Sequence, residues 1–303
     1  MVITAKMVKE LREKTGAGMM DCKKALTEAG GDIDRAGDVL RERGLAAAAK
    51  KSGRIAAEGI IKTYISEDKK SGVILELNCE TDFVAINEDF VGLSEVIAKL
   101  ILAGNFASVE EVLAAEVDGQ TVQATLTELI AKIGENMNLR RFEKFSVESG
   151  TVKDYIHGAG RIGVLVELSC ATESVEVENL AKEICMQIAA VNPVCISEAE
   201  IDQAILTKER EVLTAQALNE GKPEKIVAKM VEGRIKKYLK EICLLDQVWV
   251  KDGEMTIAKL VEAKSKEVGS PITVTKFMRF ERGEGIEKAE ENFAEEVAKM
   301  GAK

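Results

Sequence analysis

Histidine, proline and tryptophan are scarce in this chain: its 303 residues include one His, three Pro and one Trp. Structural zinc sites need clustered Cys and His at short spacing, but His157 stands alone and none of the six Cys forms a C-x-x-C pair. We therefore expect no metal site and reduced, mostly buried thiols. A single His also argues against a catalytic triad, so we expect His157 to be a turn or interface residue and not a base.

Long apolar runs are also missing. No segment approaches the roughly 20 residues that a membrane-spanning helix needs. The N-terminal residues 1–6 lead into a charged helical pattern and contain no apolar signal core. Few Pro and no low-complexity tract argue against long disordered segments. These absences predict a cytoplasmic protein of about two or three domains with no membrane partner.

Positive charge is in deficit, since the formal net charge is −10 and the pI is about 5.1. Phosphate binding depends on concentrated Lys and Arg, so we expect no direct nucleic-acid partner. No P-loop motif occurs. Residues 158–163 satisfy G-x-G-x-x-G, but a strand pattern follows where a dinucleotide site needs a helix. We interpret this segment as a Gly-rich hairpin turn, and we expect no cofactor.

The first fifty residues have the pattern of three short helices. Thr4 can cap the first, Gly30-Gly31 ends the second, and Asp32 can cap a third. A polar segment from Lys50 to Gly53 is a candidate linker to the rest of the chain.

An internal duplication follows. Strand patterns at 59–65 and 72–79 flank a polar turn and predict a hairpin, and both patterns return 91 residues later, from Gly150 and from Gly163. A helix follows in each copy, from about Asp89 to Leu102 in the first. At the same offset Cys79 corresponds to Cys170, and Phe83 corresponds to Ser174.

Phe83 directly follows the acidic turn Glu80-Thr81-Asp82 at the end of a predicted strand. An aromatic in this place either folds back into its own core or is exposed as an anchor for another protein. Most Phe side chains are buried, yet the second copy has Ser174 where a shared core would need an apolar residue. The sequence leaves both interpretations open.

Residues 197–245 interrupt the second copy with two long helical patterns on either side of a sharp break at 219–223. Ser197-Glu198-Ala199-Glu200 resembles a capping box that opens the first helix. This antiparallel hairpin is either a layer on the sheet or a protruding arm for a partner. Strands are expected at 248–250 and 272–280, and an amphipathic helix with Ile286, Phe293 and Val297 on one side is expected to end near Met300.

Several segments together are similar to bacterial elongation factor Ts. The two longest are Leu11–Leu26 (LREKTGAGMMDCKKAL) and Asn78–Ala85 (NCETDFVA), and shorter similarities lie at 157–166, 190–193 and 280–288. The resemblance covers essentially the whole chain and implies an α+β fold. It implies a ubiquitin-associated-like three-helix domain, two related α+β subdomains with the helical hairpin inserted in the second, and a C-terminal helical module. The corresponding boundaries are 1–52, 53–147, 148–280 with the hairpin at about 197–245, and 281–303.

The resemblance implies a guanine-nucleotide exchange factor that is not an enzyme. Its partner would be elongation factor Tu, GDP-bound or nucleotide-free, and the hairpin could support a homodimer. Mg²⁺ dislocation from the partner is carried over to Thr81, Asp82, Phe83 and Val84. Further partner contacts are carried over to a second set of residues and to the C-terminal module: Arg12, Met19, Met20, Lys23 and His157.

Three positions depart from the family pattern. Ile86 replaces a basic residue, Val248 a Pro and Ala289 a Lys. An ionic contact at position 86 is therefore in doubt. Two other classes of function stay open on the residues alone: a generic adaptor in which Phe83 is a core residue, and a nucleotide-binding enzyme that uses the glycine motif.

Overall fold

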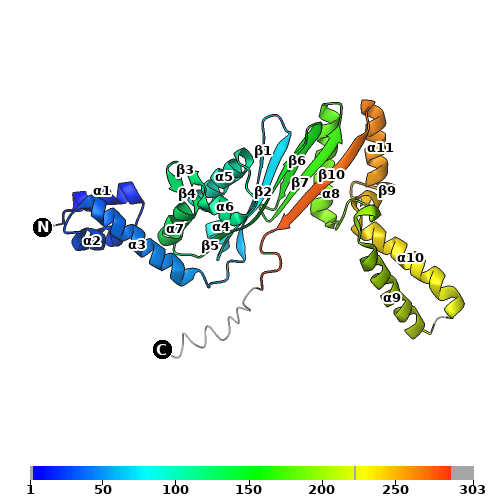
Figure 1. Cartoon of the computed structure of the whole chain (residues 1–303), viewed down its shortest axis with the longest axis horizontal. Coiled ribbons are helices and arrows are strands. Elements are labelled where there is room, and N and C mark those ends of the chain that lie inside the picture. The colour runs from blue at the N-terminus through cyan, green and yellow to red at the C-terminus, as the bar shows by residue number, and fades with distance from the viewer. Residues whose placement is uncertain (1–2, 222, 288–303) are drawn as a thin grey trace. The chain divides into compact units, whose positions relative to one another are not determined.

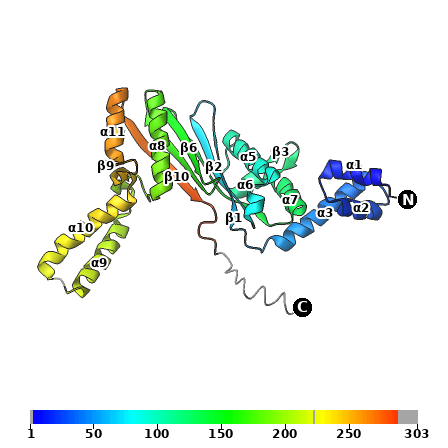
Figure 2. The same cartoon turned by 180° about the vertical axis from the view of Figure 1, so that it is seen from behind.

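The computed structural model describes residues 3–221 and 223–287, which form a mixed helix and sheet fold (Figures 1 and 2). This confirms the predicted α+β class. The described residues divide into two compact units. Unit 1 holds 3–62, 75–142 and 281–287, and unit 2 holds 63–74 and 143–280. The finer division at 52, 147 and 280 stays a prediction, as does the likeness to ubiquitin-associated domains.

Unit 1 begins with three helices, α1 (Ala5–Thr15), α2 (Met19–Glu28) and α3 (Ile33–Lys51). Thr4 caps α1 by accepting from the amide of Met7, and Asp32 caps α3 by accepting from Asp34 and Arg35, as the sequence predicts. Their buried residues form a small core of their own: Val8, Leu11, Cys22, Ala25, Leu26, Ala29 and Ala36.

The linker expected at Lys50–Gly53 is wrong in its first half. Ala46–Ala49 are strong helix formers, and Lys50 and Lys51 are cations that stabilise the negative end of a helix dipole. These residues therefore extend α3 to Lys51, and the chain turns at Ser52 and Gly53. The extended helix packs on α7 (Val122–Ile133).

The remainder of the first half contains one three-stranded sheet in the order β1-β2-β5. Its strands are β1 (Glu58–Ile65), β2 (Ser71–Cys79) and β5 (Met137–Ser146). Between β2 and β5 the chain forms three helices and a small β-hairpin before α7: α4 (Asp82–Ala85), α5 (Glu88–Ala103), α6 (Val109–Ala114), β3 (Glu116–Val117) and β4 (Gln120–Thr121).

Unit 2 contains a second sheet in the order β10-β7-β6, formed by β6 (Gly150–His157), β7 (Ile162–Cys170) and β10 (Ile272–Glu281). β6 and β7 are antiparallel, with Gly150 opposite Ser169 and His157 opposite Ile162. The glycine motif at 158–163 is therefore the hairpin turn that the sequence predicts. Helix α8 (Val175–Val191) covers these strands. β8 (Val248–Trp249) lies within the strand expected at 248–250. Two further elements of this unit were not predicted: β9 (Asp252–Thr256) and α11 (Ile257–Val268).

The internal duplication is confirmed at the level of single backbone angles. Gly59 and Gly150, 91 residues apart, have φ values of +133° and +137°. A Cβ on Gly59 would lie 2.1 Å from the carbonyl oxygen of Leu77, and one on Gly150 would lie 1.8 Å from that of Leu168. Only glycine fits such a close approach, so each copy starts with the same irregular strand.

The inserted hairpin consists of α9 (Gln203–Asn219) and α10 (Glu224–Ile242), which lie side by side (Figure 1), preceded by η1 (Glu198–Glu200) and followed by η2 (Leu244–Asp246). The capping box at Ser197 is wrong: it precedes the short turn η1 and makes no cap hydrogen bond. Asp202 caps α9 instead, by accepting from the amide of Ala204.

The hairpin buries a separate core that includes Leu206, Ala217, Val227 and Ile235. This core is distinct from the cluster that joins the sheet to α8 and α11. A hairpin that buries its apolar residues against itself is an arm and not a layer on the sheet. Homodimerisation through it stays a prediction.

Two further observations apply to residues 3–221 and 223–287 only. No helix there is long and apolar enough to cross a membrane. No group of three or more His, Cys, Asp or Glu there could hold a metal ion. The amphipathic helix expected to end near Met300 lies outside the described residues from 288 onward. Ile286, which was assigned to it, lies in an irregular segment.

Candidate partner-binding site

The acidic turn after β2 continues into α4, a helix of four residues, Asp82–Ala85. Thr81 is its N-cap and accepts from the amide of Val84 at 3.5 Å. Val84 and Ala85 point into the core, whereas Asp82 is exposed and the Phe83 side chain is 79% exposed. The alternative in which Phe83 is a core residue is therefore wrong. Val84 is buried, and its contact with a partner stays a prediction.

Glu135, in the connection between α7 and β5, fixes the start of α4. Its carboxylate accepts from the amides of Glu80 and Thr81 at 3.1 and 2.9 Å, and from the Thr81 hydroxyl at 2.6 Å. Hydrogen bonds to a charged acceptor are stronger than neutral ones. Glu80 reciprocates, because its carboxylate accepts from the amide of Asn136 at 2.6 Å. We call these residues the Glu135 clamp: Glu80, Thr81, Glu135 and Asn136.

Cys79 lies beneath the same turn and donates to the carbonyl oxygen of Thr81 at 3.1 Å. Burial, and secondarily the negative charge of Glu135, raise the pKa of Cys79 to about 12. A thiol with this pKa stays neutral at physiological pH and is a poor nucleophile. Cys79 is therefore a packing residue of the turn.

Helix α4 is an addition that only the first copy of the duplication has. The buried residues Phe90, Leu93 and Ile97 of α5 match Val177, Leu180 and Ile184 of α8 at an offset of 87. The strands match at 91, so the register shifts by the four residues of α4. Two helices with one burial pattern at this offset are structural counterparts.

The pairing of Phe83 with Ser174 is therefore wrong. An offset of 91 no longer applies once α4 is inserted. Ser174 is the N-cap of α8 and corresponds to Asn87, the N-cap of α5. Phe83 has no counterpart in the second copy, because the second copy has no helix that corresponds to α4.

Ile86 adds a second apolar side chain to this surface. It is the C-cap of α4 and is 74% exposed. The position at which the sequence departs from the family pattern thus presents an exposed apolar group three residues after Phe83. Phe83 and Ile86 are the two most exposed large apolar side chains among the described residues of unit 1.

The other predicted contact residues lie on separate elements. Arg12 is exposed on α1, and Met19, Met20 and Lys23 are exposed on α2, with α1 and α2 packed together in unit 1. His157 is exposed at the end of β6 in unit 2, where its Nδ1 lies 3.1 Å from the hydroxyl of Tyr155. All of these side chains are exposed.

A buried carboxylate that sequence reasoning missed anchors the segment after β10. Glu76 on β2 is fully buried and accepts from Arg140 at 3.1 Å, from Arg141 at 2.6 Å and from the amide of Gly283 at 2.8 Å. Arg140 and Arg141 also donate to the carbonyl oxygens of Glu284 and Glu281, at 2.6 and 3.2 Å. The start of the C-terminal segment is thus tied to the sheet of unit 1.

Electrostatics and backbone shape both favour this anchor. Burial alone would raise the pKa of Glu76, but the hydrogen bonds from Gly283, Asn78 and Arg141 outweigh it and hold the pKa below its ordinary value. Gly283 has φ of +69°, and a Cβ there would lie 2.2 Å from the carbonyl oxygen of Ala57. A side chain at position 283 would therefore break the contact.

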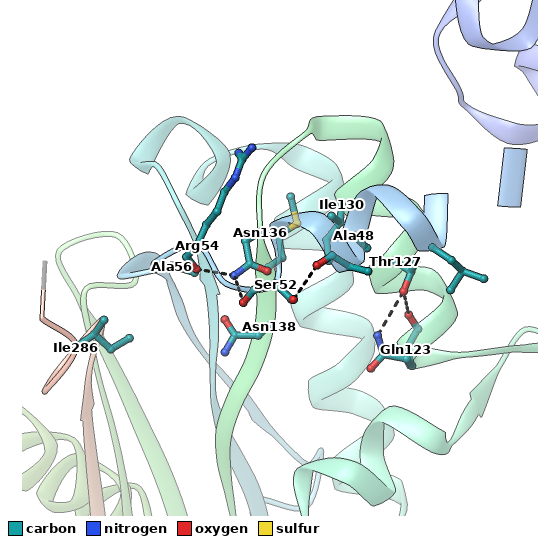
Figure 3. A pocket seen from close by; sticks show the side chains of 13 residues that line it. Ala48, Ser52, Arg54, Ala56, Gln123, Thr127, Ile130, Asn136, Asn138 and Ile286 are labelled. Atoms are coloured by element: carbon teal, nitrogen blue, oxygen red, sulfur yellow. Dashed lines mark hydrogen bonds between the residues drawn. The ribbon is translucent and has the colours of Figure 1, made fainter. Parts of the chain in front are cut away.

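A cavity of about 540 Å³ lies between the end of α3, α7 and the start of β5 (Figure 3). Asn136 of the Glu135 clamp crosses one wall, and its side chain donates to the carbonyl oxygens of Ser52 and Arg54 at 3.5 and 2.8 Å. Arg54 is the one charged side chain among the described residues that line it. The other polar residues that line it are uncharged: Ser52, Gln123, Thr127, Asn136 and Asn138.

Comparison with known proteins identifies the class. A family model described as Elongation factor TS matches residues 80–284. The Elongation factor Ts of Clostridium perfringens is 70% identical over 303 residues, with both chains covered completely. That of Clostridium botulinum is 65% identical over 300 residues, with 99% of each chain covered, and that of Clostridium kluyveri is 59% identical over 302 residues, again with 99% covered. The chain is a translation elongation factor. It belongs to the elongation factor Ts family.

Proposed function

We propose that this protein is the guanine-nucleotide exchange factor for elongation factor Tu and that α4 is the element that acts on the GTPase. One observation carries the proposal: Phe83 is 79% exposed on a helix whose base is held by the Glu135 clamp. Aromatic side chains on rigid supports are the residues that dominate binding energy in protein interfaces. Membership of the elongation factor Ts family supports the choice of partner.

In the proposed mechanism, Phe83 inserts into the GTPase domain and displaces the elements that hold Mg²⁺. The metal ion neutralises the β-phosphate of GDP, so its loss weakens GDP binding. Asp82, exposed beside Phe83, adds a negative charge that directs the encounter and disfavours rebinding of the phosphates. By linkage, GDP lowers the affinity of the exchange factor for elongation factor Tu by the same factor as the exchange factor lowers the affinity of GDP.

No step of this mechanism is a covalent reaction of this chain, so we propose that it is not an enzyme. Elongation factor Tu would be bound in its GDP form and more tightly without nucleotide. The net charge of −10 supports a protein partner over RNA. Arg12, Met19, Met20, Lys23 and His157 would add further contacts, since each of them is exposed.

The test is the release of fluorescently labelled GDP from purified elongation factor Tu, with and without this protein. We expect the rate of GDP release to rise with the concentration of this protein, even when it is present in much smaller amounts than elongation factor Tu. Binding of elongation factor Tu without faster release would favour the adaptor alternative. Tight calorimetric binding of GDP by this chain alone would favour a nucleotide-binding protein and contradict the proposal.

A further inference from the structure

Cys195 and Cys243 lie directly opposite one another at the base of the α9–α10 hairpin. They form an isolated parallel bridge, in which the amide of Cys195 donates to Ile242 and the amide of Leu244 donates to Cys195, at 3.3 and 2.9 Å. The two sulfur atoms are 3.5 Å apart. Cys195 also donates to the carbonyl oxygen of Ile242 at 3.9 Å, whereas Cys22, Cys79 and Cys185 have backbone carbonyl oxygens as the hydrogen-bond partners of their sulfur atoms.

This arrangement is suited to a disulfide. Bridged residues on neighbouring strands have Cα atoms about 5 Å apart, within the range of about 4.4–6.8 Å that disulfides need. The sulfur atoms already face each other, so a small rotation of the side chains closes the remaining gap. All of α9 and α10 lies between the two cysteines in sequence.

We propose that Cys195 and Cys243 are an oxidative modification site, where a peroxide forms one intrachain disulfide that closes the base of the hairpin. The inference is independent of the exchange function proposed above. In the first step the Cys195 sulfur attacks one peroxide oxygen, the O–O bond breaks, and a sulfenic acid and water form. In the second step the Cys243 sulfur attacks the sulfenic sulfur, the S–O bond breaks, and a second water leaves. The two thiols lose two electrons and two protons, which reduce hydrogen peroxide to water.

The difference in exposure between the two residues indicates which cysteine reacts first. Cys195 is 8% exposed and Cys243 is fully buried, so a small oxidant reaches Cys195 first. Burial raises the pKa of both thiols, to about 12 at Cys243. Because an oxidant meets the more accessible cysteine first, Cys195 is the attacking residue and Cys243 the resolving one. The reaction is slow, because little thiolate exists at neutral pH.

The test is oxidation of the full-length protein with a small excess of hydrogen peroxide, followed by alkylation under denaturing conditions and peptide mapping. We expect loss of alkylation at Cys195 and Cys243 together and a cross-linked peptide containing both, while Cys22, Cys79, Cys170 and Cys185 stay alkylated. After proteolysis inside the hairpin, the fragments should stay joined on a non-reducing gel and separate with reductant.

Two variants establish the order and give a control. In Cys243→Ser, Cys195 should accumulate as a sulfenic acid that dimedone traps. In Cys185→Ser, the disulfide should form as in the parent chain. Oxidation of another cysteine before this pair, a cross-link to a different cysteine, or full alkylation of both after prolonged exposure would each overturn the proposal. Because the parent chain carries the main readout, a variant that folds poorly does not decide the outcome.

Discussion

Thr81 donates two hydrogen bonds to Glu135, one from its amide at 2.9 Å and one from its hydroxyl at 2.6 Å. The residues are 54 positions apart in the chain. The threonine thus holds its own turn to the α7–β5 connection while it caps α4. This leaves Asp82 and Phe83 exposed on a fixed base, the arrangement that an anchor for another protein requires.

Glu135→Ala should impair exchange although Glu135 is not proposed to touch the partner. Its loss leaves the amides of Glu80 and Thr81 without their acceptor, which we expect to cost about 1–3 kcal/mol of stability, and it frees α4 to move. Chemical denaturation and labelled-GDP release measure the two effects. The exposed Glu128 on α7, changed to Ala, is the control and should alter neither. Unchanged exchange in Glu135→Ala would show that the clamp does not position the site.

Asn87→Ala and Ser174→Ala should destabilise the fold by similar amounts. Both side chains cap the first turn of equivalent helices, Asn87 by accepting from Asp89 and Phe90, and Ser174 from Val177. Loss of an N-cap typically costs about 1 kcal/mol, which urea denaturation can resolve. Ser174→Ala should leave the rate of GDP release per folded molecule unchanged. A stable Ser174→Ala protein with impaired exchange would contradict the register derived for the two copies.

Glu76→Gln should destabilise the protein at neutral pH by about 3 kcal/mol, because it leaves Arg140 and Arg141 without their buried partner charge. The pKa of Glu76 is lowered in the folded state from 4.5. Its contribution is therefore complete above pH 4.5 and is lost as the pH falls through the lower, folded-state pKa. Melting temperatures of the two proteins should differ most near neutrality and converge in acid.

Glu262→Gln is the matched control for that experiment. The pKa of Glu262 is also lowered, by its hydrogen bond and ion pair with Lys266, but both side chains are exposed. Exposed ion pairs contribute little to stability, so this variant should melt like the parent chain at every pH. An equal effect of both substitutions would mean that burial of Glu76 is not the cause.

Local patterns predicted much of the fold. Thr4 and Asp32 cap helices as their sequence context indicates, and the two β-hairpins and the α9–α10 pair lie where expected. Signals for α11 were present but missed: Thr256 is its N-cap, and Ile257, Leu260 and Val261 share its buried side. β9 has the sequence DGEMT, which lacks the alternation and β-branched residues of a typical strand.

Contacts between residues far apart in the chain could not be predicted from such local patterns. Nothing near Glu135 marks it as a partner of Thr81, since their contact exists only once α7 and β5 have packed. The same holds for Glu76, whose donors come from β5 and from Gly283. An ungapped comparison of the two copies could not reveal the insertion of α4, although the matching burial in α5 and α8 carries that signal.

Phe83→Ala tests the central claim most directly. Val194→Ala is its control, since Val194 in unit 2 is a comparably exposed apolar residue, 74% against 79% for Phe83. Because neither side chain is in a core, neither variant should shift the melting temperature appreciably. Release of labelled GDP from elongation factor Tu should fall by about 30- to 1000-fold in Phe83→Ala, the loss of about 2–4 kcal/mol expected for an anchor residue, and stay unchanged in Val194→Ala. A folded Phe83→Ala protein that promotes GDP release from elongation factor Tu as fast as the parent chain does would contradict the account.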